Sequence, residues 1–290
     1  SRSAPGVLSQ LLSMSCAPDL TLHDMTRRVS EAYVQSPHTG LILHGNLGVG
    51  LGTIAQAIGT ALNSHPEATV IIKPEDGKNI SIDQIRELYH QTRTKRRHHL
   101  TIIVDDADTM GVPAQNAFLK LLEEPPENVV FILTTHAPTL LLPTIQSRVA
   151  MIEVHPVSEQ QSREVILGLG VDDATKTTQL LFLARGNVAH ITRLVRDEDE
   201  FLRRSEMIKT ARQVIQGSSY QRLITLKEAM SDRVQAIDLM RTMGEMIAFG
   251  MQRNTSVATA RQLHLITMTI EKLETNANVR LQLVSLALSL

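Results

Sequence analysis

Short apolar runs alternate with amphipathic stretches along the first half of the chain. The apolar runs are nearly continuous, as in strands that are buried on both faces of a sheet. They are GLILHG (40–45), ATVIIK (68–73), LTIIVDD (100–106), VVFILTT (129–135) and AMIEV (150–154). Helical patterns lie between them, at residues 53–62, 81–93 and 113–124. Strands that alternate with helices predict an α/β fold with a parallel sheet and right-handed crossovers.

The pattern changes after Pro156, because all 11 prolines lie at or before that residue. A long proline-free segment rich in Leu, Ile, Met and Ala is typical of helices. Three helices are predicted at 158–167, 172–184 and 187–195, with Ser158 and Asp172 as N-caps. A charged junction, RDEDE (196–200), precedes four or five further helices, broken near QGSSY, SD and RNTS. We therefore predict an α/β unit (1–156), a small helical unit (157–198) and an all-helical unit (199–290).

Composition narrows the class of protein without identifying it. The chain is 42% hydrophobic and 20% charged, as in a globular protein, and its formal net charge of -1 gives no broad field that would attract nucleic acid. Cys16, the one cysteine, excludes a disulfide framework and a cysteine-rich zinc site. No apolar run reaches the roughly 18 residues of a membrane span, and the start lacks a secretory pattern. We expect a cytoplasmic protein.

The first strand leads into a glycine-rich turn that resembles a phosphate-binding loop. The pattern G-x-x-x-x-G-K-[ST] is matched at its glycines, which are Gly45 and Gly50, with Gly48 between them. Leu51 stands at the lysine position and Gly52 at the serine or threonine position, so neither can hold phosphate or Mg²⁺. Thr53 could ligate the metal if the register slipped by one residue. The alternative is a tight strand-to-helix turn with no ligand.

Acidic residues follow the third strand, at Asp105 and Asp106. An apolar strand that ends in acids is typical of a Walker B segment, in which Asp105 would be an indirect magnesium ligand. Asp106 stands where a glutamate normally polarises the attacking water, and its side chain is one methylene shorter. Thr134 and Thr135 lie where the fourth strand emerges, at the same edge of the predicted sheet.

Two further motifs follow the acids. Pro125 and Pro126 end the helix 113–124, and Ser147 and Arg148 close a short helical segment before the last strand. On physical grounds Arg148 is either an ordinary surface residue or one directed at a phosphate. The basic stretch RTKRRHH (93–99) is either a solvated loop at a helix end or a contact to DNA phosphates. Its two histidines have no matching ligand cluster, so no metal is predicted there.

At these residues the chain resembles a known family, the AAA+ clamp-loader subunits of DNA replication. The family's Leu-Leu-Glu-Glu-Pro-Pro turn matches residues 121–126. Its Ser-Arg-Cys motif matches Ser147, Arg148 and Val149, with valine in place of cysteine. The segment HPEATVIIKPEDGKNISIDQIREL (65–88) is similar to the one that follows the phosphate-loop helix in bacterial delta-prime subunits. The resemblance runs from residue 41 to about residue 154 and extends more weakly over the small helical unit.

The resemblance implies an AAA+ core, a helical lid and a helical collar that packs with sister subunits. Delta-prime subunits often have a degraded phosphate loop and do not hydrolyse ATP, while their Ser-Arg arginine reaches a neighbouring motor subunit's ATP site. The family thus implies a subunit of a DNA polymerase III complex, working at the nucleoid, that helps load the sliding clamp onto primed DNA. Arg148 would be an arginine finger in trans. The expected partners are gamma/tau-like ATPase subunits and delta-like subunits.

Several family positions are altered in this chain. Sensor 1 corresponds to Thr134 or Thr135, and Ala189 and His190 stand where sensor 2 places an arginine. Many bacterial relatives carry a four-cysteine zinc module after the loop helix, whereas this chain runs directly from GTALNS to HPEA. The resemblance therefore implies no bound ATP or ADP, no zinc and no intrinsic ATPase activity.

Two other functions stay open at this stage. The chain could be a divergent AAA+ ATPase that uses Thr53 for Mg²⁺, or an AAA+-derived adaptor outside replication. ATP turnover by the isolated chain would indicate a divergent ATPase. Co-purification with motor subunits distinguishes a clamp-loader subunit from an adaptor outside replication.

Overall fold

The computed structural model describes residues 20–62, 68–75, 79–92, 100–253, 256–275 and 277–290. The chain divides into two compact units, Ser1–Arg196 and Asp197–Leu290. Each unit is described by itself below. Within the described residues, no helix is both long and apolar enough to cross a membrane.

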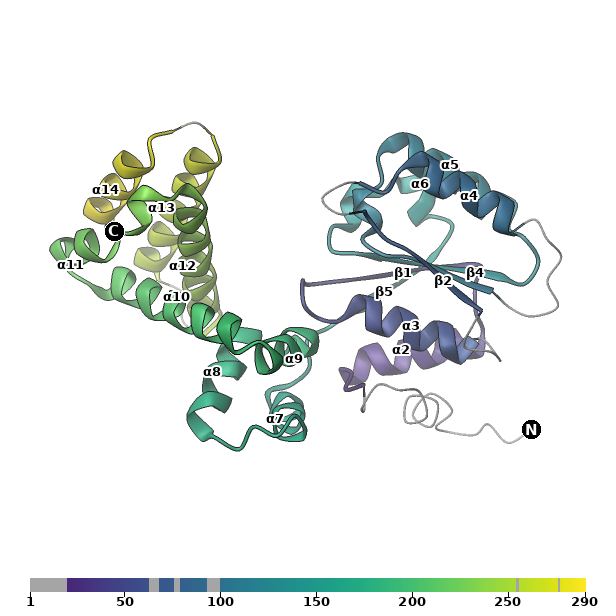
Figure 1. The fold of residues 1–290 in the computed structure, drawn as a ribbon, viewed down its shortest axis with the longest axis horizontal. Helices are drawn as coiled ribbons and strands as arrows, with labels where there is room; N and C mark the ends of the chain where they lie inside the picture. Colours follow the sequence, from purple (N-terminus) through teal and green to yellow (C-terminus); the bar gives the residue numbers. More distant parts are fainter. Residues whose placement is uncertain (1–19, 63–67, 76–78, 93–99, 254–255, 276) are drawn as a thin grey trace. The chain divides into compact units, whose positions relative to one another are not determined.

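A five-stranded parallel sheet forms the centre of the first unit and confirms the predicted fold class (Figure 1). Its spatial order is β2-β3-β4-β1-β5, and every pair of neighbouring strands is parallel. The strands are β1 (Gly40–Gly45), β2 (Thr69–Ile72), β3 (Leu100–Val104), β4 (Val129–Thr135) and β5 (Ala150–Val154). The central strands β3 and β4 are buried throughout, as their continuous apolar sequences predicted.

Helices cover both faces of this sheet (Figure 1). One face carries α2 (Asp24–Gln35) and α3 (Leu51–Leu62), and the other carries α4 (Ile82–Thr92), α5 (Val112–Glu123) and α6 (Pro143–Gln146). Successive residues of a strand point to opposite faces, so Ile42 packs with α4 and α5 while Leu41 and Leu43 pack with α2 and α3. Phe118 and Phe131 meet edge to face at 5.3 Å between ring centroids.

One helix was missed and two predicted boundaries were wrong. The helix α2 was not predicted, because its sequence is polar on average and its buried residues are Thr26, Ser30 and Tyr33 rather than an aliphatic stripe. The helix α3 begins at Leu51 rather than at residue 53, because the turn of Gly48 and Gly50 is short enough for the helix to start at once. The third strand ends at Val104, so Asp105 and Asp106 follow it rather than belong to it.

The small helical segment of the first unit contains α7 (Glu159–Gly168), α8 (Ala174–Ala184) and α9 (Val188–Arg196). Ser158 is the N-cap of α7, as predicted, and forms a capping box with Gln161. The N-cap of α8 is Asp173 and not Asp172, because the Asp173 carboxylate accepts from the backbone N–H of Lys176. The predicted division of this unit at Pro156 stays a prediction.

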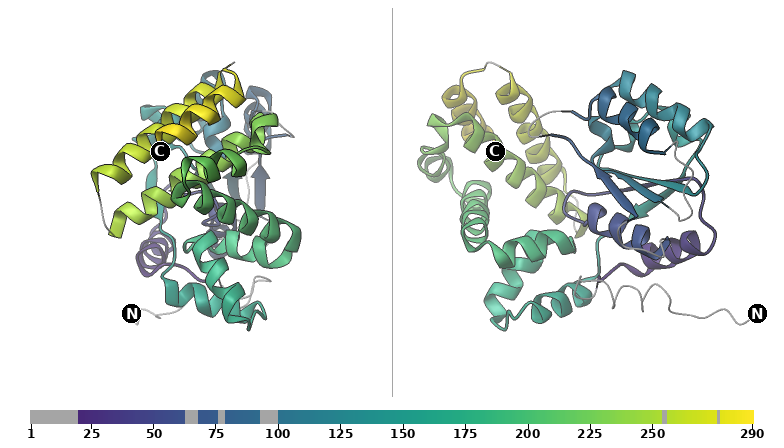
Figure 2. Two further views of the ribbon diagram at one scale, coloured as in Figure 1. Left: turned by 90° about the vertical axis from the view of Figure 1, so that its left-hand side faces the viewer. Right: turned by 45° about the vertical axis from the view of Figure 1, so that its right-hand side comes forward.

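The second unit is all helical, as predicted (Figure 2). Its helices are α10 (Glu198–Gln216), α11 (Ser219–Thr225), α12 (Arg233–Arg253), α13 (Val257–Glu274) and α14 (Val279–Ser289). The predicted breaks near QGSSY and SD are confirmed. The charged junction RDEDE (196–200) contains the boundary between the two units. Asp197 caps α10, and the three acids that follow form its first turn, where the helix dipole favours negative charge. The first unit also contains the short 3₁₀ turns η1 (Ala107–Thr109) and η2 (Pro138–Leu140), and the second unit contains η3 (Ala229–Ser231).

Candidate functional site: a phosphate-loop remnant and an exposed arginine

The turn between β1 and α3 keeps the backbone of a phosphate-binding loop. Gly48 has φ +85° and Gly50 has φ +92°, both in the left-handed region that side chains rarely adopt. The backbone N–H of Ile54 donates to the Gly50 carbonyl, so the helix starts directly after the turn. The glycines are therefore required by the shape of the turn, whatever the turn binds.

Leu51 is part of the hydrophobic core. Its residue is 4% exposed and belongs to the cluster that α3 forms with β1 and β5. A lysine at this position of a phosphate loop extends toward the phosphates, whereas Leu51 packs among apolar side chains. The neighbouring Thr53 is exposed to solvent. The position that normally neutralises phosphate thus stabilises the fold instead.

Gly52 lies against the acidic end of β3. A Cβ placed on Gly52 would lie 3.4 Å from Oδ1 of Asp105 and 3.5 Å from its Oδ2. This is where a phosphate loop presents a hydroxyl and a Walker B acid faces it across Mg²⁺. The structure therefore brings the glycine-rich turn next to the acids that follow β3. Gly52 has no side chain and so offers no hydroxyl to a metal ion.

Thr134 connects the two acids that follow β3. Its Oγ1 donates to Oδ1 of Asp105 at 2.6 Å and accepts from the backbone N–H of Asp106 at 3.1 Å. Asp106 has φ +52°, a left-handed conformation that aspartate adopts more readily than most residues. Burial, followed by the Asp105 and Asp108 carboxylates, raises the pKa of Asp106, and His136 opposes this shift.

A second set of contacts at this edge was not predicted from the sequence. Oγ1 of Thr135 donates to Oδ1 of Asp108 at 2.6 Å, and the backbone N–H of His136 donates to the same oxygen at 3.3 Å. The Nδ1 atom of His136 lies 2.8 Å from the carbonyl oxygen of Gly45. The ends of β1, β3 and β4 are therefore joined by side chains, and Asp108 and His136 belong to the site.

The start of α9 packs on the glycine turn. The backbone N–H of His190 donates to the Gly48 carbonyl at 3.2 Å. A Cβ on Gly48 would lie 3.0 Å from the Cβ of His190, and one on Gly50 would lie 3.6 Å from the Cβ of Ala189. The two residues at the sensor 2 position therefore lie beside the loop, as expected, and neither is an arginine.

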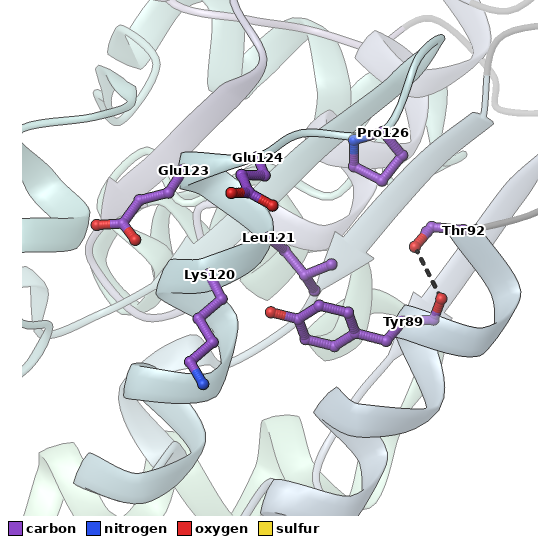
Figure 3. A pocket seen from close by; sticks show the side chains of 7 residues that line it. All are labelled: Tyr89, Thr92, Lys120, Leu121, Glu123, Glu124 and Pro126. Carbon is purple, nitrogen blue, oxygen red and sulfur yellow. Dashed lines mark hydrogen bonds between the residues drawn. The ribbon is translucent and has the colours of Figure 1, made fainter.

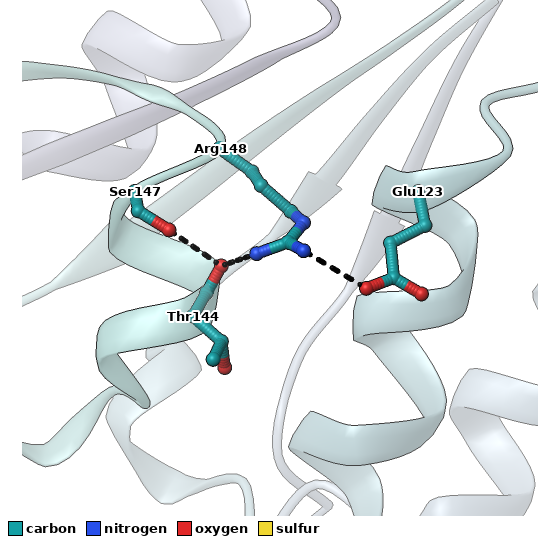
Figure 4. Close-up of polar contacts among 4 residues, drawn as sticks. All are labelled: Glu123, Thr144, Ser147 and Arg148. Carbon is teal, nitrogen blue, oxygen red and sulfur yellow. Dashed lines mark hydrogen bonds and ion pairs between the residues drawn. The ribbon is translucent and has the colours of Figure 1, made fainter.

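Arg148 lies outside this network and is held by two acceptors (Figure 4). Its Nη2 donates to Oε1 of Glu123 at 3.0 Å, and its Nη1 donates to the Thr144 carbonyl at 3.0 Å. The two side chains of the ion pair are 39% and 45% exposed, for Arg148 and Glu123 respectively. Arg148 is thus a partly exposed arginine with a fixed orientation. The pair joins the Glu-Glu-Pro-Pro turn to the Ser-Arg motif, which lie 25 residues apart.

A pocket of about 450 Å³ lies on the other side of the same turn (Figure 3). Tyr89 and Thr92 of α4 line it, together with residues around the end of α5, which are Lys120, Leu121, Glu123, Glu124 and Pro126. Burial, then the nearby Glu124 and Glu123 carboxylates, raises the pKa of the Tyr89 hydroxyl. The pocket has one cation against two acids, so its lining does not select one class of ligand.

The absence of a metal site and the two alternatives for the basic stretch both stay predictions. In the part of the chain that the structure describes, no group of three or more His, Cys, Asp or Glu residues is arranged to hold a metal ion. The basic stretch 93–99, with its two histidines, lies outside the described residues.

Comparison with known proteins places this geometry in context. A family model described as "DNA polymerase III, delta subunit" matches residues 59–158. The delta-prime subunit of DNA polymerase III from Pseudomonas aeruginosa is 38% identical over 90 residues, which are 30% of this chain and 27% of that protein. The Bacillus subtilis delta-prime subunit is 30% identical over 148 residues, 50% of this chain and 44% of its own length. The chain therefore matches less than half the length of these relatives.

A solved structure extends the comparison of the fold alone. A DNA polymerase III gamma-subunit-related protein of Thermotoga maritima aligns with a TM-score of 0.56 at 23% identity, covering 91% of this chain and 98% of that one. The parallel sheet, the glycine turn before α3 and the acids after β3 are features of the class of fold that the resemblance to AAA+ proteins implied, and this alignment supports the fold alone. Residues 59–158 are thus similar to the DNA polymerase III delta-subunit family, and the matched relatives are delta-prime subunits of DNA polymerase III.

Proposed function

We propose that this chain does not hydrolyse ATP and instead supplies Arg148 to the ATP site of a neighbouring clamp-loader subunit. The observation that carries the proposal is the contrast between two positions. Leu51, where a lysine would bind phosphate, is 4% exposed and packed in the core. The Arg148 side chain is 39% exposed and its guanidinium is oriented by two acceptors.

The chain's own site lacks the parts that phosphoryl transfer requires. Leu51 cannot neutralise β- or γ-phosphate charge, and Gly52 cannot ligate Mg²⁺. Asp106 is one methylene shorter than the glutamate that normally polarises the attacking water, and the residues beside the loop from α9 are Ala189 and His190. We infer that neither ATP nor ADP is a resident cofactor and that the loop remains as architecture.

Arg148 has the chemistry that a site in trans would use. A guanidinium stays charged at all physiological pH values, and its planar fork matches phosphate oxygens in two places. An arginine supplied to a neighbour stabilises the charge that develops in phosphoryl transfer and contributes roughly 10³–10⁵ in rate in other systems. On this proposal the chain completes the ATP site of a gamma/tau-like subunit, and the complex loads the sliding clamp onto primed DNA.

The helical second unit offers apolar side chains for assembly. In α14, Leu283 and Leu286 are buried in the unit's own core, whereas Leu281 and Leu288 are 64% and 63% exposed. One helix therefore buries some of its leucines and exposes others. We infer that the exposed leucines contact sister subunits of the gamma/tau and delta types, since exposed apolar side chains on a helix favour a protein partner.

The first test is ATP turnover by the isolated chain. We expect phosphate release at background, because three required groups are absent or altered. Asp105→Ala is the control, since any activity of this site would need that acid. Release above background that Asp105→Ala abolishes would instead identify a divergent ATPase.

The second test is Arg148→Ala in a complex reconstituted with wild-type motor subunits, sliding clamp and primed DNA. We expect part of the clamp- and DNA-stimulated ATPase to be lost and clamp loading to slow, while the chain folds and assembles normally. The matched control is Arg163→Ala, since Arg163 is another exposed arginine in a carboxylate pair, with Glu159. Unchanged ATPase and loading rates, with assembly confirmed by size-exclusion chromatography, would leave Arg148 as an ordinary surface residue.

A further inference from the structure

Glu123 occupies a position that helix electrostatics disfavours. It is the last residue of α5, and Glu124 follows it as the C-cap. The C-terminal end of a helix carries partial negative charge, so cations are favoured there and two carboxylates are not. Lys120 supplies one cation in the same turn. A residue placed against the local preference is expected to gain something from a contact elsewhere.

The contact that Glu123 makes is with Arg148. The Glu123 carboxylate accepts from Nη2 at 3.0 Å, while the Thr144 carbonyl accepts from Nη1 at 3.0 Å (Figure 4). The Thr144 carbonyl also accepts from Oγ of Ser147 at 3.2 Å, so the last turn of α6 is tied to the same point. The guanidinium contacts two elements, α5 and α6, and these two bonds favour one orientation of its plane.

This arrangement restrains a side chain that otherwise has many rotamers. A free arginine has several rotatable bonds, and orienting it against a phosphate costs conformational entropy at the moment of binding. Holding it in one orientation beforehand removes part of that cost. The guanidinium has five N–H donors, so the two contacts leave N–H groups for an oxyanion.

We propose that Glu123 is a positioning residue, which orients the Arg148 guanidinium before the neighbouring subunit's ATP engages it. This inference rests on the proposed function of Arg148 in trans. Glu123 touches no reacting atom and acts only through the arginine. Glu124 lies beside it at the same helix end and, like Glu123, lines the pocket next to Tyr89, but the ion pair with Arg148 is made by Glu123, so Glu124 is the natural comparison.

The expected size of the effect follows from the exposure of the pair. With side chains 39% and 45% exposed, it belongs to the class of exposed ion pairs, whose measured coupling corresponds to a factor of roughly 1.4 to 5. Such a pair is strong enough to bias an orientation. It is also weak enough to be exchanged for a phosphate that carries more charge.

The experiment compares the stimulated ATPase of reconstituted complexes that contain wild-type, Glu123→Ala, Glu123→Gln, Glu124→Ala, Arg148→Ala or Glu123→Ala/Arg148→Ala chains. We expect Glu123→Ala to lower kcat about two- to fivefold with KM for ATP unchanged. Glu123→Gln should recover at least half of that loss, because its amide oxygen accepts the same N–H. Glu124→Ala should match the wild type, and the double variant should be no slower than Arg148→Ala alone.

The outcomes separate this inference from the function on which it rests. If Arg148→Ala slows the complex while Glu123→Ala leaves it unchanged or faster, the positioning role is wrong and the finger in trans stands. An equal loss with Glu124→Ala, or no recovery with Glu123→Gln, would attribute the effect to local charge or folding and would also overturn the role. If Arg148→Ala has no effect, both the proposed function and this inference fail.

Discussion

Restoring the missing loop residues offers a direct test of how this site has changed. The variant combines Leu51→Lys with Gly52→Thr and so recreates the residues of an intact phosphate loop. In the structure Leu51 is 4% exposed and packs between α3 and the sheet. Gly52 has room for a side chain, since its Cβ would meet Asp105 at ordinary contact distances of 3.4 and 3.5 Å. The two substitutions should therefore differ sharply in their effect on stability.

The magnitude follows from burial. Burying a leucine side chain contributes about 1.5–3 kcal/mol. A lysine recovers part of that through its methylenes, but its ammonium must leave the core or lose its charge, and each unit of lowered pKa costs about 1.4 kcal/mol. We expect Leu51→Lys to lower the free energy of unfolding by about 2–4 kcal/mol. Gly52→Thr alone should stay within about 0.5 kcal/mol, because it replaces a helical glycine without a clash.

The assay is thermal unfolding together with hydrogen exchange of peptides from β1 and α3. A loss of this size lowers Tm by about 2–4 °C for each kcal/mol in a unit of this length. Exchange should accelerate in β1 and α3 and not in the helices of the second unit. ATP turnover should stay at background in the double variant, because Asp106 and the sensor 2 position are unchanged.

Two results would refute this reasoning. A Leu51→Lys chain with wild-type Tm and unchanged exchange would mean that Leu51 is not a core residue. Robust ATP turnover by the double variant would mean that the remainder of the site is competent, and that the loop residues alone had silenced it.

Two further predictions concern other parts of the chain. Because burial and the neighbouring Asp105 and Asp108 carboxylates raise the pKa of Asp106, the folded chain binds its proton more tightly than the unfolded chain, and stability falls as pH rises through that pKa. Asp106→Asn should therefore raise Tm at pH 7, with a gain that shrinks toward pH 4; an equal Tm at both pH values would contradict it. In the second unit, Leu281→Asp with Leu288→Asp should leave the chain's own Tm nearly unchanged, since both side chains are exposed, and should weaken assembly with motor subunits on size-exclusion chromatography. Assembly at wild-type affinity would exclude these leucines from the contact.

The central strands β3 and β4 could be predicted from the sequence because they are continuous apolar runs that the sheet buries throughout. The helix α2 could not, because Met25 and Val29 are exposed while Thr26 and Ser30 are buried. The sequence also identified the turn at Gly48 and Gly50, since only glycine adopts that backbone without strain.

Side-chain contacts between distant segments set the limit of prediction at the site. Asp108 and His136 looked ordinary in the sequence, and only the register of β3 against β4 brings them to the same edge. The pairing of Glu123 with Arg148 is equally invisible in the sequence, because nothing in either motif specifies the orientation of α5 relative to α6. Comparison with the motif revealed that a lysine was missing, but it could not reveal that the leucine had joined the core.

Because Leu51 packs in the core, the residues that are accepted at position 51 differ from those of a nucleotide-binding loop. A residue that contacts substrate is restricted by chemistry, so almost any replacement is harmful. A residue that only fills space is restricted by volume and polarity, so Ile or Met should be accepted at position 51 at a cost below about 1.5 kcal/mol. At Gly52 a Cβ would contact the Asp105 carboxylate at 3.4 and 3.5 Å, so small residues should be accepted there. Random mutagenesis of positions 51 and 52 that is selected for folding alone should therefore recover apolar residues at position 51, where a nucleotide-binding loop requires lysine.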